Sequence, residues 1–176
     1  MNPGKEHIVS FSRKKIMSVV RMNLFFVLLF GFGLVLFTVR PTERTVIFQL
    51  LAVPLIVLFG FSLISTARKL NKKSPGLVVS PKGILENSSF FPVGLIAWND
   101  IVSIHVQQAR STRWLMIEVR NPEQYFAPDN LLIRTFQRLN SIFGAGAIFL
   151  SASLIDIDFD EMVSLIKQYH EKYGSA

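Results

Sequence analysis

Two long runs of hydrophobic residues dominate the first third of the chain. Residues 22–39 (MNLFFVLLFGFGLVLFTV) and 45–67 (TVIFQLLAVPLIVLFGFSLISTA) contain no charged side chain. With a helical rise of about 1.5 Å per residue, each run is long enough to cross the hydrocarbon core of a bilayer. Only residues 40–44 separate the two runs, so the pattern predicts an antiparallel transmembrane hairpin with a short loop.

Buried core helices and a cleaved signal peptide also contain long apolar runs, but both fit this chain less well. A pair of buried core helices would need a large protein around them, and residues 76–176 are too few to enclose two such helices. A cleaved signal peptide could account for the first run alone. Its apolar stretch is too long for that role, and no small-x-small cleavage pattern follows it.

Positive charges flank the predicted hairpin on one side of the membrane. They are Arg13, Lys14, Lys15 and Arg21 before the first run, and Arg68, Lys69, Lys72 and Lys73 after the second. The connecting loop holds two arginines and a glutamate. The positive-inside rule therefore predicts a two-pass protein with both termini in the cytoplasm and residues 40–44 outside. Residues 1–21 would form a basic cytoplasmic segment, and residues 68–75 a basic linker held near the lipid headgroups.

The polar content of the two runs indicates an anchor more than a transport path. Asn23 and Gln49 are their only amide side chains, and neither run contains a carboxylate or a cation. Intramembrane ionisable groups mark most transport paths. Small residues at Gly31, Gly33 and Gly60 are expected to let the two helices approach closely.

From residue 76 onward the pattern changes to short β-prone segments separated by turn residues. Strands are predicted at residues 77–80, 83–86, 93–98, 101–107, 114–119 and 147–151. In the fourth segment, alternation places Ile101, Ser103, His105 and Gln107 on one side, and Val102, Ile104 and Val106 on the other. The pattern leaves open whether residues 7–12 add a strand to the domain, although residues 8–11 would fit one.

Three helical signals accompany these strands. Residues 121–125 resemble a helix start, with Asn121 as the capping residue and Pro122 at the first helical position. Apolar residues then recur at helical spacing over residues 132–143. The final helix has Asp158 as its N-cap and Glu161 as the reciprocal partner, and it ends at Gly174. Strands closed by a last amphipathic helix favour an α+β domain over residues 76–176.

Several segments together resemble one family of proteins. They are residues 12–15, 94–101, 121–125 and 140–144, with the closing helix. They are similar to an uncharacterised family of small bacterial membrane proteins with a two-helix N-terminal hairpin. The resemblance implies a pleckstrin-homology-like (PH-like) cytoplasmic domain, built as an antiparallel β-sheet or barrel closed by a C-terminal amphipathic helix. It implies no catalytic residue.

Charge and composition remove several functional classes. The net charge of +7 comes from residues 1–74, which hold 11 Lys/Arg and 2 Asp/Glu, while residues 75–176 hold 8 and 10. The basic charge thus accompanies the membrane segments, and no basic nucleic-acid-binding domain is indicated. The absence of cysteine excludes disulfides, thiolate nucleophiles and cysteine-based zinc sites.

No motif for catalysis, cofactor binding or metal binding emerges. Asp156, Asp158 and Asp160 imitate the start of a calcium loop, but the sixth and twelfth positions of that loop are Glu161 and Lys167. The three histidines are far apart in the sequence, with no HExxH pattern. We therefore expect no catalytic residue, no metal and no cofactor.

Exposed cations in the domain are the remaining candidates for ligand contact. Arg110 and Arg113 lie in a predicted hairpin loop next to Trp114, and Arg134 and Arg138 lie on one face of the predicted 132–143 helix. They would meet a lipid headgroup or an acidic partner, although a solvated surface is the simpler explanation for such residues.

These observations lead to one preferred function and two rivals. The preferred function is that of a membrane-anchored, non-enzymatic interaction module. An immunity protein or a regulatory protein would be a specific example of such a module. Anchoring would raise the effective concentration of the domain toward membrane-bound partners. The rivals are a lipid-binding or lipid-modifying enzyme with its site at the membrane surface, and an accessory subunit of a membrane complex.

Overall fold

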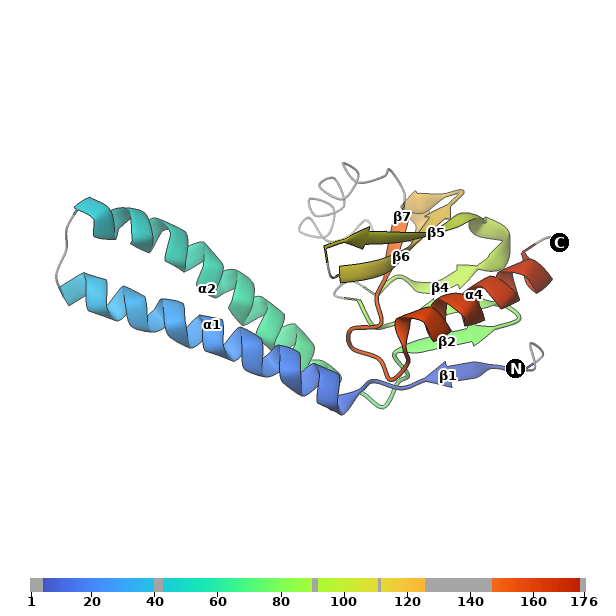
Figure 1. Ribbon diagram of the computed structural model, residues 1–176, viewed down its shortest axis with the longest axis horizontal. Coiled ribbons are helices and arrows are strands. Elements are labelled where there is room, and N and C mark those ends of the chain that lie inside the picture. The colour runs from blue at the N-terminus through green and yellow to red at the C-terminus, as the bar shows by residue number, and fades with distance from the viewer. Residues whose placement is uncertain (1–4, 40–42, 90–91, 111, 126–146, 175–176) are drawn as a thin grey trace. The chain divides into compact units, whose positions relative to one another are not determined.

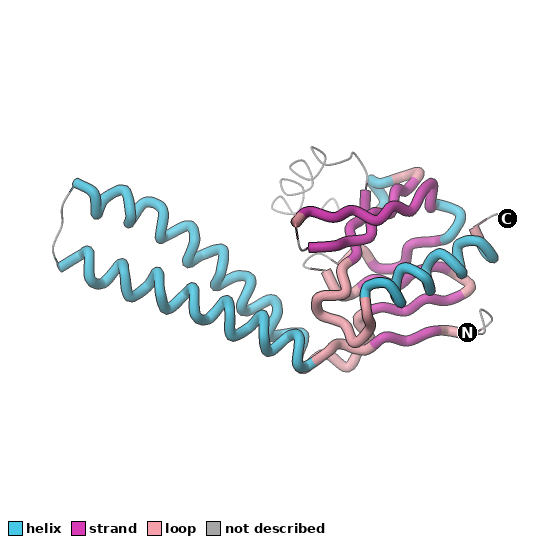
Figure 2. Tube along the Cα trace, viewed as in Figure 1, coloured by secondary structure: helices cyan, strands magenta, loops and turns pink. Residues whose placement is uncertain are grey.

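The computed structural model describes residues 5–39, 43–89, 92–110, 112–125 and 147–174. The chain divides into two units: a helical unit, Ser12–Lys72, and a sheet unit made of Met1–Phe11 and Lys73–Ala176. Figure 1 labels their elements, and Figure 2 shows strands together with helix in the sheet unit and two long helices in the other unit. The predicted order of two long apolar helices followed by a β-sheet domain is confirmed.

The helical unit is an antiparallel pair, α1 (Arg13–Val39) and α2 (Glu43–Lys69), lying side by side in Figure 1. Aromatic rings hold the pair together at two levels. Phe26 stacks on Phe59 with ring centroids 4.7 Å apart, and Phe37 meets Phe48 edge-on at 4.8 Å. Dispersion contacts of this kind stabilise helix pairs even where lipid removes the hydrophobic driving force.

Most apolar side chains of the two helices face outward. In the most hydrophobic window of each helix, only 6% of the residues are buried. A core helix of a soluble protein would be mostly buried. By length and composition, both helices are suited to crossing a membrane.

The glycines differ from the prediction that all three bring the helices together. Only Gly33 faces the partner helix, where an added Cβ would lie 2.7 Å from Cζ of Phe48. A Cβ on Gly31 or Gly60 would meet no atom within 4 Å. The prediction was wrong for these two positions because the helical period turns them away from the interface.

The Gly33 contact predicts a side-specific effect of larger residues. Gly33→Leu should destabilise helix pairing by about 1–3 kcal/mol, because the new side chain overlaps the Phe48 ring. The chain contains no cysteine, so a Phe26→Cys, Phe59→Cys background reports pairing through the yield of one disulfide in detergent. The matched change Gly31→Leu should leave that yield unchanged. Equal yields for the two leucine variants would contradict the assigned interface.

The sheet unit contains two antiparallel sheets. The first has the order β1 (His7–Val9), β2 (Leu77–Ser80), β3 (Gly83–Glu86), β4 (Gly94–Ala97). The second has the order β5 (Ile101–Ala109), β6 (Thr112–Val119), β7 (Ala147–Leu150). In the described residues the two sheets are not closed, so the sheet alternative of the sequence prediction holds and the barrel alternative does not.

Each of the six predicted strands is present, with ends that differ by a few residues. A seventh strand is also present, in the segment before the hairpin for which the sequence left strand formation open. Residues 7–9 form β1, in which Ile8 lies opposite Val78 of β2. The chain therefore leaves the first sheet, forms the whole helical hairpin, and returns to pair with the strand that it left.

A register shift in β5 changes the predicted alternation. The pairing with β6 is irregular between Ile101 and Ser103. This bulge resets the two-residue period, so Ile101 is buried and Ile104 also packs against the core. The predicted placement of these two isoleucines on opposite faces was wrong, because a strict period cannot anticipate a bulge.

Short 3-10 helices connect the sheets to the neighbouring segments. They are η1 (Trp98–Asp100) and η2 (Pro122–Gln124). Pro122 opens η2 as expected, but Asn121 makes no side-chain capping bond, so that predicted cap is absent. The helix predicted over residues 132–143 lies outside the described residues.

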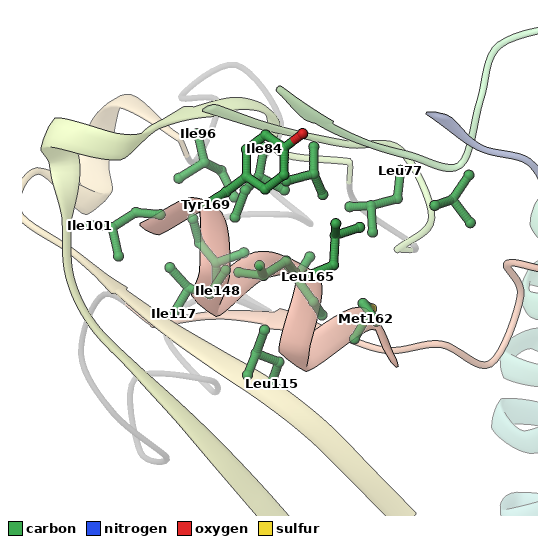
Figure 3. Packing of buried hydrophobic residues seen from close by; sticks show 14 of the residues in the cluster. Leu77, Ile84, Ile96, Ile101, Leu115, Ile117, Ile148, Met162, Leu165 and Tyr169 are labelled. Carbon is green, nitrogen blue, oxygen red and sulfur yellow. The ribbon is translucent and has the colours of Figure 1, made fainter. Parts of the chain in front are cut away.

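The final helix, α4 (Phe159–Tyr173), begins as the sequence predicts. The side chain of Asp158 accepts a hydrogen bond from the backbone N–H of Asp160 at 2.9 Å. The buried face of α4 presents Met162, Leu165 and Tyr169 to both sheets. Figure 3 shows these side chains converging with those of the two sheets in one core. Both sheets and α4 therefore depend on the same packed interior.

Candidate functional site

The side chain of Arg113 is engaged with its own chain. Its Nη1 donates to Oδ2 of Asp160 at 3.1 Å, and its Nη2 pairs with the other carboxylate oxygen. Its guanidinium carbon also lies 4.5 Å from the ring centroid of Phe159. The hydrogen bond from Arg113 lowers the pKa of Asp160 and raises the pKa of Arg113 itself. An anionic ligand would have to displace Asp160 to reach this guanidinium.

Arg110 and Trp114 do not converge with Arg113 on one site. Ala109 pairs with Thr112, so Arg110 sits in the exposed turn between β5 and β6, where its φ is 54°. Trp114 is half-buried, and because strand side chains alternate it points to the opposite face of the sheet from Arg113. The structure therefore spreads these three predicted contact residues over separate surfaces. Arg134 and Arg138 lie outside the described residues.

The predicted topology determinants lie around the start of α1 and the end of α2, which form one end of the antiparallel pair. Arg13, Lys14 and Lys15 form the first turn of α1, and Arg21 lies two turns further along, where its Nε donates to the carbonyl oxygen of Met17 at 3.3 Å. Arg68, Lys72 and Lys73 are exposed at or after the end of α2. Lys69 differs from them, since only 6% of it is exposed.

Asn23 and Gln49 are the two amide side chains of the apolar runs. Asn23 is buried, and its Nδ2 donates to the carbonyl oxygen of Val19 at 2.9 Å, within the same helix. Gln49 is half-buried near the start of α2. This back-bond satisfies one of the two amide hydrogens of Asn23 within its own helix.

The histidines and carboxylates do not assemble a metal site in the part of the chain that the structure describes. His105 is exposed on β5, and His7 meets the Tyr169 ring edge-on at 5.9 Å. The ring of His170 lies 6.1 Å from that of Trp98, and its Nε2 is buried without a hydrogen-bond partner. Each of the three is thus placed on a different element.

One polar cluster stabilises the connection between the two sheets. Oδ2 of Asp100 accepts hydrogen bonds from the hydroxyl of Tyr125 at 2.5 Å and from Nε2 of Gln124 at 2.8 Å. Burial raises the pKa of Tyr125, and the hydrogen bond to Asp100 raises it further. The cluster ties η2 to η1, and its tyrosine is kept in the neutral, donating form.

A cavity of about 320 Å³ lies beside β1, and we call it the edge cavity. Residues 7–10 line one side, and Asp156, Ile157, Glu161 and Leu165 line the other. Residues 7–10 belong to β1 and the residue after it, while the other side includes the exposed carboxylates of Asp156 and Glu161 and the buried side chain of Leu165. The edge cavity therefore suits a ligand that offers backbone hydrogen bonds and positive charge.

Two contacts hold the walls of the edge cavity together. The hydroxyl of Tyr169 on α4 donates to the carbonyl oxygen of Lys5, just before β1. The backbone N–H of Asp156 donates to the carbonyl oxygen of Ser10 at 2.9 Å, just after β1. Burial raises the pKa of Tyr169, which keeps this hydroxyl protonated as a donor. Strand β1 is thus fixed at both ends against the segment that leads into α4 and against α4 itself.

The sequence prediction of site residues did not include the edge cavity. Its walls come from residues 7–10 and 156–165, which are close only because β1 joins the first sheet. The apolar pattern of residues 8–11 was the available signal for the strand. Asp156 was considered only as part of a calcium loop, and Glu161 only in that loop and at the helix start, since no pattern in the sequence links them to β1.

Comparison with models of known protein families, with curated proteins and with solved structures finds no match to this chain.

Proposed function

We propose that this protein is a membrane-anchored, non-enzymatic interaction module. Its sheet unit would be presented at the cytoplasmic face of a bacterial inner membrane. Residues 22–39 and 45–67 would cross the bilayer, residues 40–44 would form the outer loop, and residues 68–75 would link the second span to the domain. A protein partner in the membrane or the cytoplasm would then bind the sheet unit.

The pairing of β1 with β2 is the observation that carries this proposal. β1 precedes the helical hairpin and β2 follows it, and residues 7–9 pair directly with residues 77–79. Two strands of one sheet must lie on the same side of a membrane. The segment between them must therefore cross an even number of times, which supports two crossings by α1 and α2 and opposes a cleaved leader.

The distribution of cations supports the cytoplasmic orientation. Arg13, Lys14 and Lys15 stand at the start of α1, and Arg68, Lys72 and Lys73 are exposed around the end of α2. These ends lie on the same side because the helices are antiparallel. Positively charged flanks of short loops are retained in the cytoplasm during insertion.

The described strands support a PH-like domain as the type of module. Four antiparallel strands in one sheet and three in the other share one core with a C-terminal helix. This agrees with the fold that the family resemblance implies. In this arrangement the membrane hairpin would be an insertion between the first two strands of the domain.

The orientation can be tested with single cysteines, since the chain has none. A membrane-impermeant maleimide should label Thr42→Cys in cells whose inner membrane is intact. Glu171→Cys, on the exposed side of α4, should be labelled only after the membrane is opened. Labelling of both positions in intact cells, or the reverse pattern, would contradict a two-pass protein with cytoplasmic termini.

The function itself is tested by crosslinking the full chain in native membranes, purifying it in mild detergent and analysing the product by mass spectrometry. A stoichiometric protein partner is the expected result. Recovery of the chain alone, or with one enriched lipid species, would contradict an interaction module and would direct attention to the lipid-binding alternative.

A further inference from the structure

Strand β1 is the edge of the first sheet, and the direction of its backbone groups can be deduced from its flanks. The carbonyl oxygen of Val9 accepts from the N–H of Gly76, which lies on the β2 side. The carbonyl oxygen of Ser10 accepts from the N–H of Asp156, which lies on the opposite side. Backbone groups of successive strand residues point in alternate directions. The N–H and C=O of Ile8 therefore point away from β2.

The outer side of β1 is occupied only over its last part. Phe11 forms an isolated antiparallel bridge with Ile155, and Asp156 bonds to Ser10. The chain then turns into α4 with Asp158 as its cap. In the described residues, no strand continues this pairing alongside Ile8. The edge cavity lies at this point, between β1 and the side chains of Glu161 and Leu165.

We propose that the edge cavity is a docking site for an extended peptide segment of a partner protein, which adds to β1 as a further strand and places a basic side chain toward Asp156 and Glu161. This inference rests on the proposed interaction function and names the chemistry of the partner. Unpaired edge strands bind extended peptides through backbone hydrogen bonds, and alternate side chains supply specificity.

The surroundings of Ile8 define which side chains the segment should carry. The residue opposite Ile8 shares the outer face of the sheet, where Ile8 itself is 64% exposed, so an apolar side chain is favoured there. Its two neighbours point to the other face of the sheet, where α4 contributes Glu161 and Leu165 to the cavity, while Asp156 lies opposite Ser10 on the outer face. The preferred segment thus has an apolar residue between two basic ones.

Charge complementarity selects a basic peptide over an acidic one. Both carboxylates of the edge cavity are exposed. Asp160, the neighbouring carboxylate, is already paired with Arg113 and is not among the cavity residues. A cation in the cavity would therefore face two carboxylates, whereas a carboxylate would be repelled by both.

The test measures binding of fluorescein-labelled five-residue peptides to the full chain in non-ionic detergent micelles by fluorescence anisotropy. The probes are fluorescein-Thr-Lys-Val-Lys-Thr-amide, with the label on the N-terminal amine, the same peptide with both lysines replaced by glutamate, and the lysine peptide with proline at its centre. The lysine peptide should saturate below about 1 mM. The glutamate and proline peptides should bind at least tenfold more weakly, and empty micelles should bind none of them.

Two variants locate the binding. Ile8→Pro removes the outward N–H while sparing the bonds to β2, and it should weaken the lysine peptide at least tenfold. Glu161→Lys reverses one exposed charge and should weaken it about fivefold, within the range measured for exposed ion pairs. Glu171→Lys makes the same change on α4 away from the cavity and should have no effect. If Ile8→Pro unfolds the protein, the comparison of Glu161→Lys with Glu171→Lys still tests whether the peptide binds in the edge cavity.

The proposal is overturned if the lysine peptide does not saturate, if the glutamate peptide binds equally well, or if Glu161→Lys and Glu171→Lys behave alike. Failure of the wider function is a separate result. A stoichiometric partner that crosslinks equally to the wild type, Ile8→Pro and Glu161→Lys would retain the interaction module and reject this docking site. Saturable peptide binding without any partner in native membranes would retain this docking site and contradict the proposed interaction module.

Discussion

Replacing Gly83 by alanine is expected to destabilise the sheet unit by about 3–5 kcal/mol, among the largest effects of any single substitution in this chain. Gly83 opens β3 with a φ of +150°, a conformation that L side chains rarely adopt. An added Cβ would overlap the carbonyl oxygen of Ile96 and lie 2.9 Å from its carbonyl carbon. Backbone of a paired strand cannot rotate aside, so β3 and β4 would have to separate.

The effect can be measured by urea unfolding of the full chain in detergent, followed by tryptophan fluorescence. Both tryptophans lie in the sheet unit, and Trp98 is 2% exposed, so the signal reports this unit. Gly94→Ala is the matched control. It also has a positive φ, of +79°, but an added Cβ would meet no atom within 4 Å. It should cost only the conformational strain of about 1–2 kcal/mol. Equal losses would refute the steric argument.

Replacing Glu86 by alanine is expected to cost about 3–5 kcal/mol, because a fully buried carboxylate organises the loop after β3. Glu86 has no exposed surface. Its Oε1 accepts from the backbone N–H groups of Ser88 and Ser89, both at 2.6 Å, and from the Ser88 hydroxyl at 2.8 Å. Its Oε2 accepts from the Ser89 hydroxyl at 2.8 Å and from the Val93 N–H at 3.3 Å. The substitution would leave these donors without their acceptor.

The same unfolding measurement tests this prediction with two companions. Glu123→Ala removes an exposed carboxylate and should change stability by no more than about 0.5 kcal/mol. Glu86→Gln keeps the side-chain volume and one acceptor oxygen, but its amide donor faces other donors. Its loss of stability should therefore fall between those of Glu123→Ala and Glu86→Ala. A loss for Glu86→Ala no larger than that for Glu123→Ala would show that the loop does not need the carboxylate.

Local signals were sufficient for most elements of the fold. Strands β2 and β3 were predicted with their ends, since the turn at Pro81 and Lys82 interrupts two short β-prone runs. The start of α4 was predicted because Asp158 caps it through a bond within the same turn. These features depend on neighbours in the sequence, so the sequence displays them directly.

The features that sequence reasoning missed depend on contacts between distant segments. The bulge in β5 is settled by the pairing with β6, and the direction of Gly31 and Gly33 by the packing of α1 on α2. The role of Arg113 changed for the same reason. Arg113 was placed in the predicted hairpin loop, but its partner Asp160 lies 47 residues away. No local sequence pattern predicts a partner at that distance along the chain.

The sequence by itself determined the two apolar helices, their polar flanks, the six central strands and the capped final helix. It did so because hydrophobic periodicity, charge and capping act over a few residues. Only the tertiary structure decided that residues 7–9 pair with residues 77–79 across the hairpin, and that this strand borders a cavity walled by Glu161 and Leu165. Strand pairing satisfies backbone groups that every sequence has, so the choice of partner depends on the shared core, which forms only when the distant segments pack together.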